Sequence, residues 1–315
     1  MKYTGLSQNC HQLDFQCVFS GKYNTIFRKT YLKGYRLGHF ATAPSGIGFF
    51  IMGEADMNCI TSTSNAQVKQ LISLQKKAKE RNAQDVFIVE GIKMYQEVPA
   101  DRLVHTYVSE SFYAKHKTLF EGRKQVTLLA DRVFEAVSDT KTPQGVLCLV
   151  KQYHYELDDL YGKKAMIMVL ENLQDPGNLG TILRTGEGAG VTGILMTKGC
   201  VDLYNPKVIR STMGSIYRMP FYYTDDLKRD LLILKEHGVT LYAAHLKGTG
   251  TYDEQDYSAP TGFLIGNESK GLSDETAELA DVYVKIPMCG QVESLNAAVA
   301  SAVLMYEGNR QRRKA

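Results

Sequence analysis

The sequence predicts an α/β protein in which a small N-terminal α/β domain precedes a larger one. Short, continuous apolar runs such as Met166–Leu170 and Gly262–Gly266 are typical of buried strands in a mostly parallel sheet. Segments with helical spacing lie between these runs, and this alternation is typical of α/β domains. The length of 315 residues suggests two domains, or one large domain with an appendage.

The composition fits a globular protein with enough apolar residues for a core. Hydrophobic residues make up 44% of the chain, and no apolar run reaches the roughly 18 residues that a membrane helix needs. The net charge of +3 is compatible with an anionic partner and equally with ordinary solubility. The six cysteines form no C-x-x-C pair, so we expect reduced thiols in a cytoplasmic protein and no metal site.

Residues 1–56 do not match the rest of the chain, because neither helical nor strand periodicity is evident in them. We expect a non-native or disordered N-terminal extension, with Met57 as the native start. The codons of Gly53 and Glu54 can supply a purine-rich ribosome-binding site just upstream of Met57. Met52 is the alternative start, and a genuine accessory arm is the alternative for the whole segment.

Residues 65–150 read as one compact α/β domain. A helix is expected over Ala66–Asn82, because Val68, Leu71 and Ile72 follow helical spacing on one face. Four strands are expected after it, at Val86–Val89, Val104–Val108, Val126–Leu129 and Gly145–Val150. The polar residues 151–164 resemble a linker to the second domain.

Basic side chains cover much of the remaining surface of the first expected helix. They are Lys69, Lys76, Lys77, Lys79 and Arg81. These residues are candidate RNA-binding residues, because lysine and arginine neutralise backbone phosphates. A solvated helix face without a partner is the alternative.

The C-terminal half begins with the buried strand Met166–Leu170, followed by turn residues at Glu171–Gly177 and a helix over Asn178–Ala189. The later elements expected are a strand at Gly193–Thr197, helices at Asn205–Ser215 and Leu227–His237, strands at Val239–Ala244, Gly262–Gly266 and Val282–Ile286, and a helix at Ser294–Gly308. Ligands of open α/β sheets bind beyond the carboxyl ends of the strands. Motifs that follow the strands are therefore the candidates for a site.

Three motifs stand at such positions. Asn178–Arg184 reads NLGTILR, Ile265–Gly271 reads IGNESKG, and Ile286–Met288 reads IPM and leads to Ser294–Asn296, which reads SLN. Asn178 and Arg184 are six residues apart, close to two helical turns, so they point to broadly the same side. Each motif alone is a weak signal, but their order and their places after apolar runs make the combination specific.

Together with the segment Asn205–Pro220, these motifs make residues 165–312 resemble the methyltransferase domain of the SpoU (TrmH) family, a branch of the SPOUT superfamily. Phe87–Gly91 followed by Thr142–Val146 resembles the L30e-like substrate-binding domain that precedes this domain in many RNA ribose methyltransferases. The resemblance implies S-adenosylmethionine as the cofactor and a deep trefoil knot, which ordinary topology rules would not predict. It also implies a homodimer with the active site near the subunit interface.

The resemblance places the family's catalytic arginine at Arg184. A guanidinium stays protonated and is a poor base, but it can stabilise a developing alkoxide and hold the adjacent phosphate. The further catalytic candidates are Asn178, Glu268, Ser294 and Asn296, for which a capping or turn role is the alternative. Gly266, Ile286, Met288 and Leu295 match the family's cofactor-binding positions. His245 follows a strand end and is either a lining residue of the site or structural.

The resemblance therefore implies an S-adenosylmethionine-dependent RNA methyltransferase that acts on a ribose 2′-hydroxyl, with 23S ribosomal RNA as the favoured substrate. Transfer RNA is one alternative substrate. A non-catalytic RNA-binding or ribosome-assembly factor on the same fold is an alternative of another class. A Rossmann-type methyltransferase is not supported, because no G-x-G-x-x-G follows the first strand.

Overall fold

The computed structural model describes side chains for residues 59–123, 125–246, 248 and 250–313. Before residue 59 it describes only the backbone of four strands. The chain forms two compact units, Met1–Asn58 and Cys59–Ala315. In the first unit, the described strands pair antiparallel in the order β1 (Phe15–Val18), β2 (Phe27–Leu32), β3 (Tyr35–Phe40) and β4 (Gly48–Ile51). The other residues of the expected extension, Met52 and Met57 included, lie outside the described residues, so the native start stays a prediction.

The second unit begins with a five-stranded sheet in the order β5-β8-β7-β9-β6. Its strands are β5 (Cys59–Ile60), β6 (Val86–Glu90), β7 (Leu103–Ser109), β8 (Val126–Leu129) and β9 (Val146–Lys151). The helices around them are α1 (Ala66–Lys76), α2 (Ala78–Gln84), α3 (Ile92–Glu97), α4 (Glu110–Lys115), the 3₁₀ turn η1 (Lys117–Phe120) and α5 (Asp131–Val137). The four strands expected in this region are confirmed to within two residues at each end.

The prediction of a single helix over Ala66–Asn82 is wrong, because the helix is interrupted at Lys77. Lys77 has an extended backbone, with φ −121° and ψ 113°, between α1 and α2. The guanidinium of Arg81 donates to the carbonyl oxygens of Leu74 and Gln75, at 2.6 and 3.3 Å, which are end groups of α1 without an intrahelical partner. The break therefore lets a side chain of the second helix cap the first.

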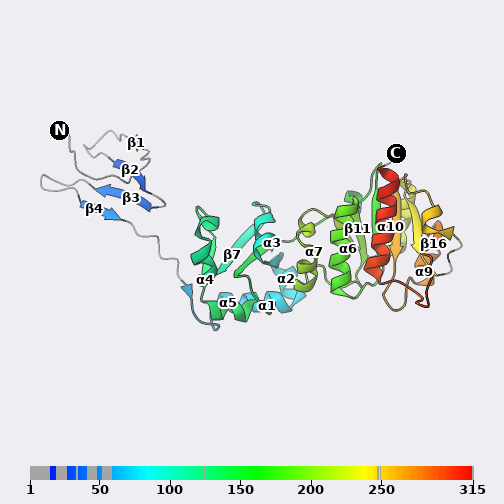
Figure 1. The fold of residues 1–315 in the computed structure, drawn as a ribbon, viewed down its shortest axis with the longest axis horizontal. Helices are drawn as coiled ribbons and strands as arrows, with labels where there is room; N and C mark the ends of the chain where they lie inside the picture. Colours follow the sequence, from blue (N-terminus) through cyan, green and yellow to red (C-terminus); the bar gives the residue numbers. More distant parts are fainter. Residues whose placement is uncertain are drawn as a thin grey trace. The chain divides into compact units, whose positions relative to one another are not determined.

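The larger part of the unit is a seven-stranded parallel sheet in the order β12-β11-β10-β15-β13-β16-β14 (Figure 1). Its strands are β10 (Met166–Leu170), β11 (Gly193–Thr197), β12 (Phe221–Thr224), β13 (Thr240–Ala244), β14 (Gly250–Thr251), β15 (Thr261–Ile265) and β16 (Val282–Lys285). The other elements are α6 (Pro176–Ala189), α7 (Pro206–Thr212), α8 (Leu227–Glu236), α9 (Asp274–Ala277), α10 (Ala297–Arg312) and the 3₁₀ turns η2 (Leu157–Asp159), η3 (Ser215–Tyr217) and η4 (Tyr252–Glu254).

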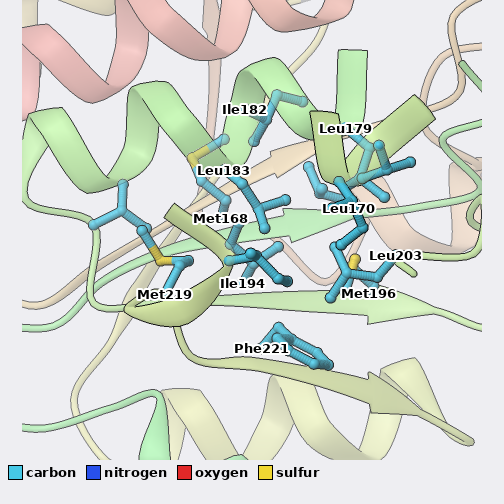
Figure 2. Packing of buried hydrophobic residues seen from close by; sticks show 14 of the residues in the cluster. Met168, Leu170, Leu179, Ile182, Leu183, Ile194, Met196, Leu203, Met219 and Phe221 are labelled. Atoms are coloured by element: carbon cyan, nitrogen blue, oxygen red, sulfur yellow. The ribbon is translucent and has the colours of Figure 1, made fainter. Parts of the chain in front are cut away.

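Alternate residues of β10 face two separate cores, as the pleat of a strand requires. On one face, Met168 and Leu170 pack with Leu179 and Leu183 of α6, as Figure 2 shows. On the other face, the core that contains Val169 is closed by α8 and α9. Both sides of the sheet are thus covered, which explains why its central strands are apolar throughout.

The first of these cores continues into the smaller domain. Phe87 of β6 is fully buried and stacks on Tyr204, with ring centroids 4.7 Å apart. The hydroxyl of Tyr204 accepts a hydrogen bond of 2.7 Å from the backbone N–H of Tyr153, in the expected linker. Tyr153 and Leu160 are themselves buried, so the linker is packed against both domains. None of the described helices is both long and apolar enough to cross a membrane.

Candidate active site

The first motif begins α6 at the carboxyl edge of the sheet. The carboxylate of Asp175 accepts a hydrogen bond of 2.8 Å from the backbone N–H of Asn178, and Pro176 stands in the first turn. The helix therefore starts two residues before the expected Asn178, which lies inside it and is buried. A Cβ on Gly180 would lie 2.3 Å from the Cβ of Ser211, so a glycine is required for α6 to pack against α7.

A chain of side-chain hydrogen bonds joins the three motifs. Asn296 donates from Nδ2 to Oδ1 of Asn178 over 2.9 Å, and Asn178 donates from Nδ2 to Oε1 of Glu268 over 3.0 Å. Asn296 is also the N-cap of α10, where its Oδ1 accepts from the backbone N–H groups of Ala298 and Val299. Both amides are thereby fixed in orientation by their partners.

Glu268 holds two loops together as a carboxylate. It accepts hydrogen bonds from the backbone N–H groups of Asp175, at 2.9 Å, and Gln174, at 3.1 Å, as well as from Asn178. Partial burial raises the pKa of Glu268, but these donors outweigh it and lower the pKa below its ordinary value. Glu268 is therefore ionised at neutral pH and serves as an anchor, which makes it a poor reservoir for a proton.

A cavity of about 620 Å³ opens beside this chain, at the ends of β13, β15 and β16. The four expected cofactor residues, Gly266, Ile286, Met288 and Leu295, all line it. Glu268, Ser294 and His245 line it as well. We call this space the donor cavity. Its volume and its mixture of apolar side chains with loop backbone fit the adenosine of S-adenosylmethionine.

The glycines of the second motif shape one wall of the donor cavity. A Cβ on Gly266 would lie 2.0 Å from the carbonyl carbon of Gly271, which no side chain can tolerate. Asn267 and Gly271 exchange backbone hydrogen bonds of 3.0 and 2.9 Å, and Gly271 has a φ of +71°. The loop therefore folds back tightly on itself, which places its backbone groups at the cavity.

Arg184 does not meet the other candidates within one chain. The expectation that it shares a side of α6 with Asn178 is wrong, because six residues leave two helical side chains about 120° apart, and Asn178 is buried whereas Arg184 is exposed. It is exposed on α6, does not line the donor cavity, and makes no hydrogen bond or ion pair with the described residues. The candidates from the second and third motifs are thus brought together with Asn178, while Arg184 stands apart with its charge uncompensated.

Among the candidate RNA-binding residues, the structure places Lys69, Lys76, Lys77 and Lys79 on the surface. The prediction that Arg81 contacts RNA is wrong. Its side chain is only 4% exposed and forms an ion pair with Asp202 of the larger domain. The helix break buries Arg81, so its guanidinium is not available to a phosphate.

The sequence analysis did not name three polar residues as candidates: Asn172 and Gln174, which precede the first motif, and Lys270, which lies within the second. They line a second cleft that shares a wall with the donor cavity. Their position directly after β10 and β15 was the available signal, because side chains that follow neighbouring parallel strands converge at one edge.

Within the described part of the chain, no group of three His, Cys, Asp or Glu side chains is arranged to hold a metal ion.

Comparison with known proteins agrees with this geometry. Residues 165–306 match the SpoU rRNA Methylase family, and residues 65–148 match the MRM3-like substrate binding domain. The chain is 31% identical over 260 residues to the 23S rRNA (guanosine(2553)-2'-O)-methyltransferase RlmP of Bacillus subtilis, covering 79% of this chain and 98% of that protein. The chain belongs to the SpoU family of RNA methyltransferases. A tRNA/rRNA methyltransferase of Synechocystis is 35% identical over 82% of this chain and 95% of its own length.

Solved structures of similar methyltransferases confirm the fold and the cofactor. An AdoMet-bound rRNA methyltransferase from Sinorhizobium meliloti matches with a TM-score of 0.70 and 29% identity, over 80% of this chain and 97% of that chain. AviRb from Streptomyces viridochromogenes in complex with AdoMet matches with a TM-score of 0.72 and 25% identity, over 80% and 99%. This SpoU protein is therefore an S-adenosylmethionine-dependent methyltransferase. Its parallel-sheet domain follows a substrate-binding domain along the chain. The trefoil knot stays a prediction.

Proposed function

We propose that this SpoU enzyme methylates a ribose 2′-hydroxyl in 23S ribosomal RNA. The observation that carries the proposal is the chain of hydrogen bonds from Asn296 through Asn178 to Glu268, at the rim of the donor cavity. It gathers polar groups suited to a ribose next to a space suited to the donor. The similarity to the 23S rRNA methyltransferase of Bacillus subtilis over nearly its whole length supports ribosomal RNA as the substrate.

S-adenosylmethionine supplies an activated methyl group when bound, so the residues of the chain have to position the ribose and assist loss of its proton. Asn178 and Asn296 are fixed by their hydrogen bonds and orient the sugar, with Ser294 beside them. Arg184 stabilises the developing 2′-alkoxide and holds the neighbouring phosphate, which accepts the proton of the hydroxyl. Glu268 keeps Asn178 in place and remains ionised throughout.

The proposed enzyme works as a homodimer. Arg184 is exposed and lies outside the donor cavity of its own chain, so a second copy is needed to bring an arginine to the ribose. The adjacent helix α10 exposes Val299 and Tyr306, which are 49% and 50% accessible. An apolar surface of this kind beside an uncompensated arginine fits an interface between two copies. The exposed lysines of α1, α2 and the break between them, Lys69, Lys76, Lys77 and Lys79, are proposed to contact RNA phosphates. The cytoplasm is the proposed location.

The test is a methyl-transfer assay with purified protein, labelled S-adenosylmethionine, and unmodified transcripts of 23S rRNA and of a transfer RNA pool. We expect label in 23S rRNA, at a site that resists alkaline cleavage because its 2′-hydroxyl is blocked. Label in transfer RNA alone would reject the proposed substrate. Absence of both methyl transfer and S-adenosylmethionine binding would favour the non-catalytic assembly factor.

A further inference from the structure

A second cleft lies on the other side of the loop that walls the donor cavity. It has a volume of about 530 Å³, and its lining includes Asn172, Gln174, Asn267, Lys270 and Gly271. Asn267, Lys270 and Gly271 line both this cleft and the donor cavity. We call it the loop cleft. Any group bound there is separated from the donor by the thickness of one loop.

Asn172 is held rigidly at the edge of the loop cleft. Its backbone carbonyl accepts a hydrogen bond of 2.8 Å from Nδ2 of Asn267, and its Oδ1 accepts one of 3.2 Å from the hydroxyl of Thr197. A Cβ on Gly199 would lie 1.9 Å from this Oδ1, so the glycine makes room for the side chain. The oxygen end of the amide is thus engaged by protein, and the NH₂ end is left over.

Three polar groups of the loop cleft have no partner among the described residues. They are Nδ2 of Asn172, Oε1 of Gln174 and Nζ of Lys270, none of which takes part in a hydrogen bond or ion pair. The amide nitrogen of Gln174 donates a hydrogen bond to the backbone carbonyl of Gly199. The amide oxygen of Gln174 is therefore the end that is left without a partner. The cleft therefore offers one amide donor, one amide acceptor and one cation.

The only carboxylate at the loop cleft, among the residues that the structure describes there, is already satisfied. Glu171 is buried and accepts hydrogen bonds from the backbone and hydroxyl of Ser273, at 2.8 and 2.7 Å, and from the hydroxyl of Thr276, at 2.7 Å. These donors occupy both of its oxygens, so the ammonium of Lys270 does not pair with this carboxylate and is left to a ligand. The chemistry of the cleft thus fits a phosphate next to a planar group that both donates and accepts.

We propose that the loop cleft binds the RNA nucleotide adjacent to the methylated one, which deepens the proposed function and rests on it. Lys270 contacts the phosphate between the two nucleotides, and the amides of Asn172 and Gln174 pair with the edge of the unstacked base. An amide donor and an amide acceptor that line one cleft can pair with the hydrogen-bonding edge of a nucleobase, and splayed-out bases are how proteins read RNA sequence.

The test measures binding of an unmodified 23S rRNA transcript by fluorescence anisotropy, for the wild type and for Asn172→Asp, Gln174→Ala and Lys270→Ala. Asn172→Asp keeps the oxygen that accepts from Thr197 and removes the free donor, and Asp tolerates the φ of +54° at this position. We expect each variant to bind RNA about ten-fold more weakly, and Lys270→Ala to reduce the salt dependence by about one phosphate contact.

The matched control is Lys198→Ala. Lys198 is an exposed lysine on a neighbouring loop, is paired with Asp225, and lines neither space. Its removal is expected to change RNA affinity less than two-fold, roughly the effect of an exposed ion pair. Calorimetric affinity for S-adenosylmethionine is measured in parallel and is expected to be unchanged in Asn172→Asp, Gln174→Ala and Lys198→Ala, because these three residues do not line the donor cavity.

RNA affinity equal to that of the wild type in the three loop-cleft variants would overturn the proposal. Weaker S-adenosylmethionine binding by Lys270→Ala, with RNA affinity kept, would overturn it too and assign Lys270 to the donor cavity. Both readouts are binding measurements. A wild type that binds the RNA but transfers no methyl group would reject the proposed function without deciding the fate of the cleft, which the variant affinities decide by themselves.

Discussion

Arg184 carries a full positive charge on the exposed side of α6, with no carboxylate partner among the described residues. Replacement with alanine is expected to leave S-adenosylmethionine binding intact, because the side chain does not line the donor cavity. Methyl transfer is expected to fall by about 10²- to 10³-fold, the usual effect of losing one group that stabilises a developing oxyanion. Calorimetry and a single-turnover methylation assay check the two parts.

The control for this prediction is Arg184→Lys, which keeps the charge but not the planar fork that grips a phosphate in two places. It is expected to recover part of the activity lost in the alanine variant. Turnover of Arg184→Ala equal to that of the wild type would remove Arg184 from the mechanism.

Glu268 provides a pH-dependent test, because its pKa is lowered in the folded protein. A carboxyl with a lowered pKa stabilises the fold above the unfolded pKa, near 4.5, and this contribution is lost as the pH falls through the folded pKa. Glu268→Gln is therefore expected to be less stable than the wild type at neutral pH, with a difference that shrinks on acidification. Urea denaturation from about pH 7 to pH 3 measures it. If the difference in stability between the two proteins grew towards acid pH, the pKa of Glu268 would not be lowered in the folded protein.

At the residue scale, the motifs predicted the donor cavity well but not the network that supports it. Gly266, Ile286, Met288 and Leu295 converge because each follows a strand of one parallel sheet. The bond between Asn296 and Asn178 joins residues 118 positions apart, and no local pattern reveals such a pairing. Arg81 was misassigned for a related reason, since the partner that buries it, Asp202, is distant in sequence.

At the level of elements, the C-terminal end of α10 is held by one arginine. Arg312 donates to the backbone carbonyls of Tyr257, Lys164, Ala165 and Ala259, at distances of 2.7 to 2.9 Å. Arg312→Ala is expected to lower the free energy of unfolding by about 2 kcal/mol, because several carbonyls lose a charged donor at once. Urea denaturation measures the change.

Arg310→Ala is the matched control for Arg312, because Arg310 lies on the same turn and its one ion-pair partner among the described residues is Glu307. Its loss is expected to cost about 0.5 kcal/mol or less. Equal effects of the two substitutions would mean that the carbonyl contacts of Arg312 add nothing to stability.

The strands that were predicted in the second unit are right, because apolar runs of four to six residues bounded by turn residues have few alternatives. The strand β12 and the two-residue strands β5 and β14 were not predicted. Helix ends were less accurate, since they depend on the capping residue. Asp175 starts α6 before the expected Asn178, and Asn296 delays α10 beyond the expected Ser294. The delay leaves Ser294 and Leu295 in a loop, where they line the donor cavity.

At the scale of the whole molecule, the smaller and larger domains of Cys59–Ala315 are joined by specific contacts. These contacts are the ion pair of Arg81 with Asp202 and the stacked rings of Phe87 and Tyr204. Asp202→Ala is expected to lower the free energy of unfolding by about 3 kcal/mol, because it leaves a buried guanidinium without its counter-charge. Denaturation of the variant, followed by tyrosine fluorescence, measures this loss.

Asp225→Ala provides the comparison, because it breaks the exposed pair with Lys198 and is expected to cost less than about 1 kcal/mol. A double-mutant cycle with Arg81→Met and Asp202→Ala separates the pair from the cost of burial. A cost for Asp202→Ala as small as that of Asp225→Ala would show that the domains are not locked through this pair.

The two-domain α/β organisation was predictable because strands and helices alternate throughout residues 65–312, whereas the packing of the linker was not. Its polar composition resembled a flexible connection, but Tyr153 and Leu160 anchor it in the core. Burial of these two side chains depends on Tyr204 and other distant residues, which a local pattern does not show.

The central claim is that this SpoU enzyme places a methyl group on a 23S rRNA ribose with the help of Arg184. The most direct measurement maps 2′-O-methyl groups over all ribosomal and transfer RNA in a strain that lacks the gene, and in the same strain carrying the wild-type or the Arg184→Ala protein. The predicted result is one 23S rRNA ribose that loses its methyl group on deletion and regains it with the wild type but not with Arg184→Ala. An unchanged 23S rRNA map in the deletion strain would contradict the claim.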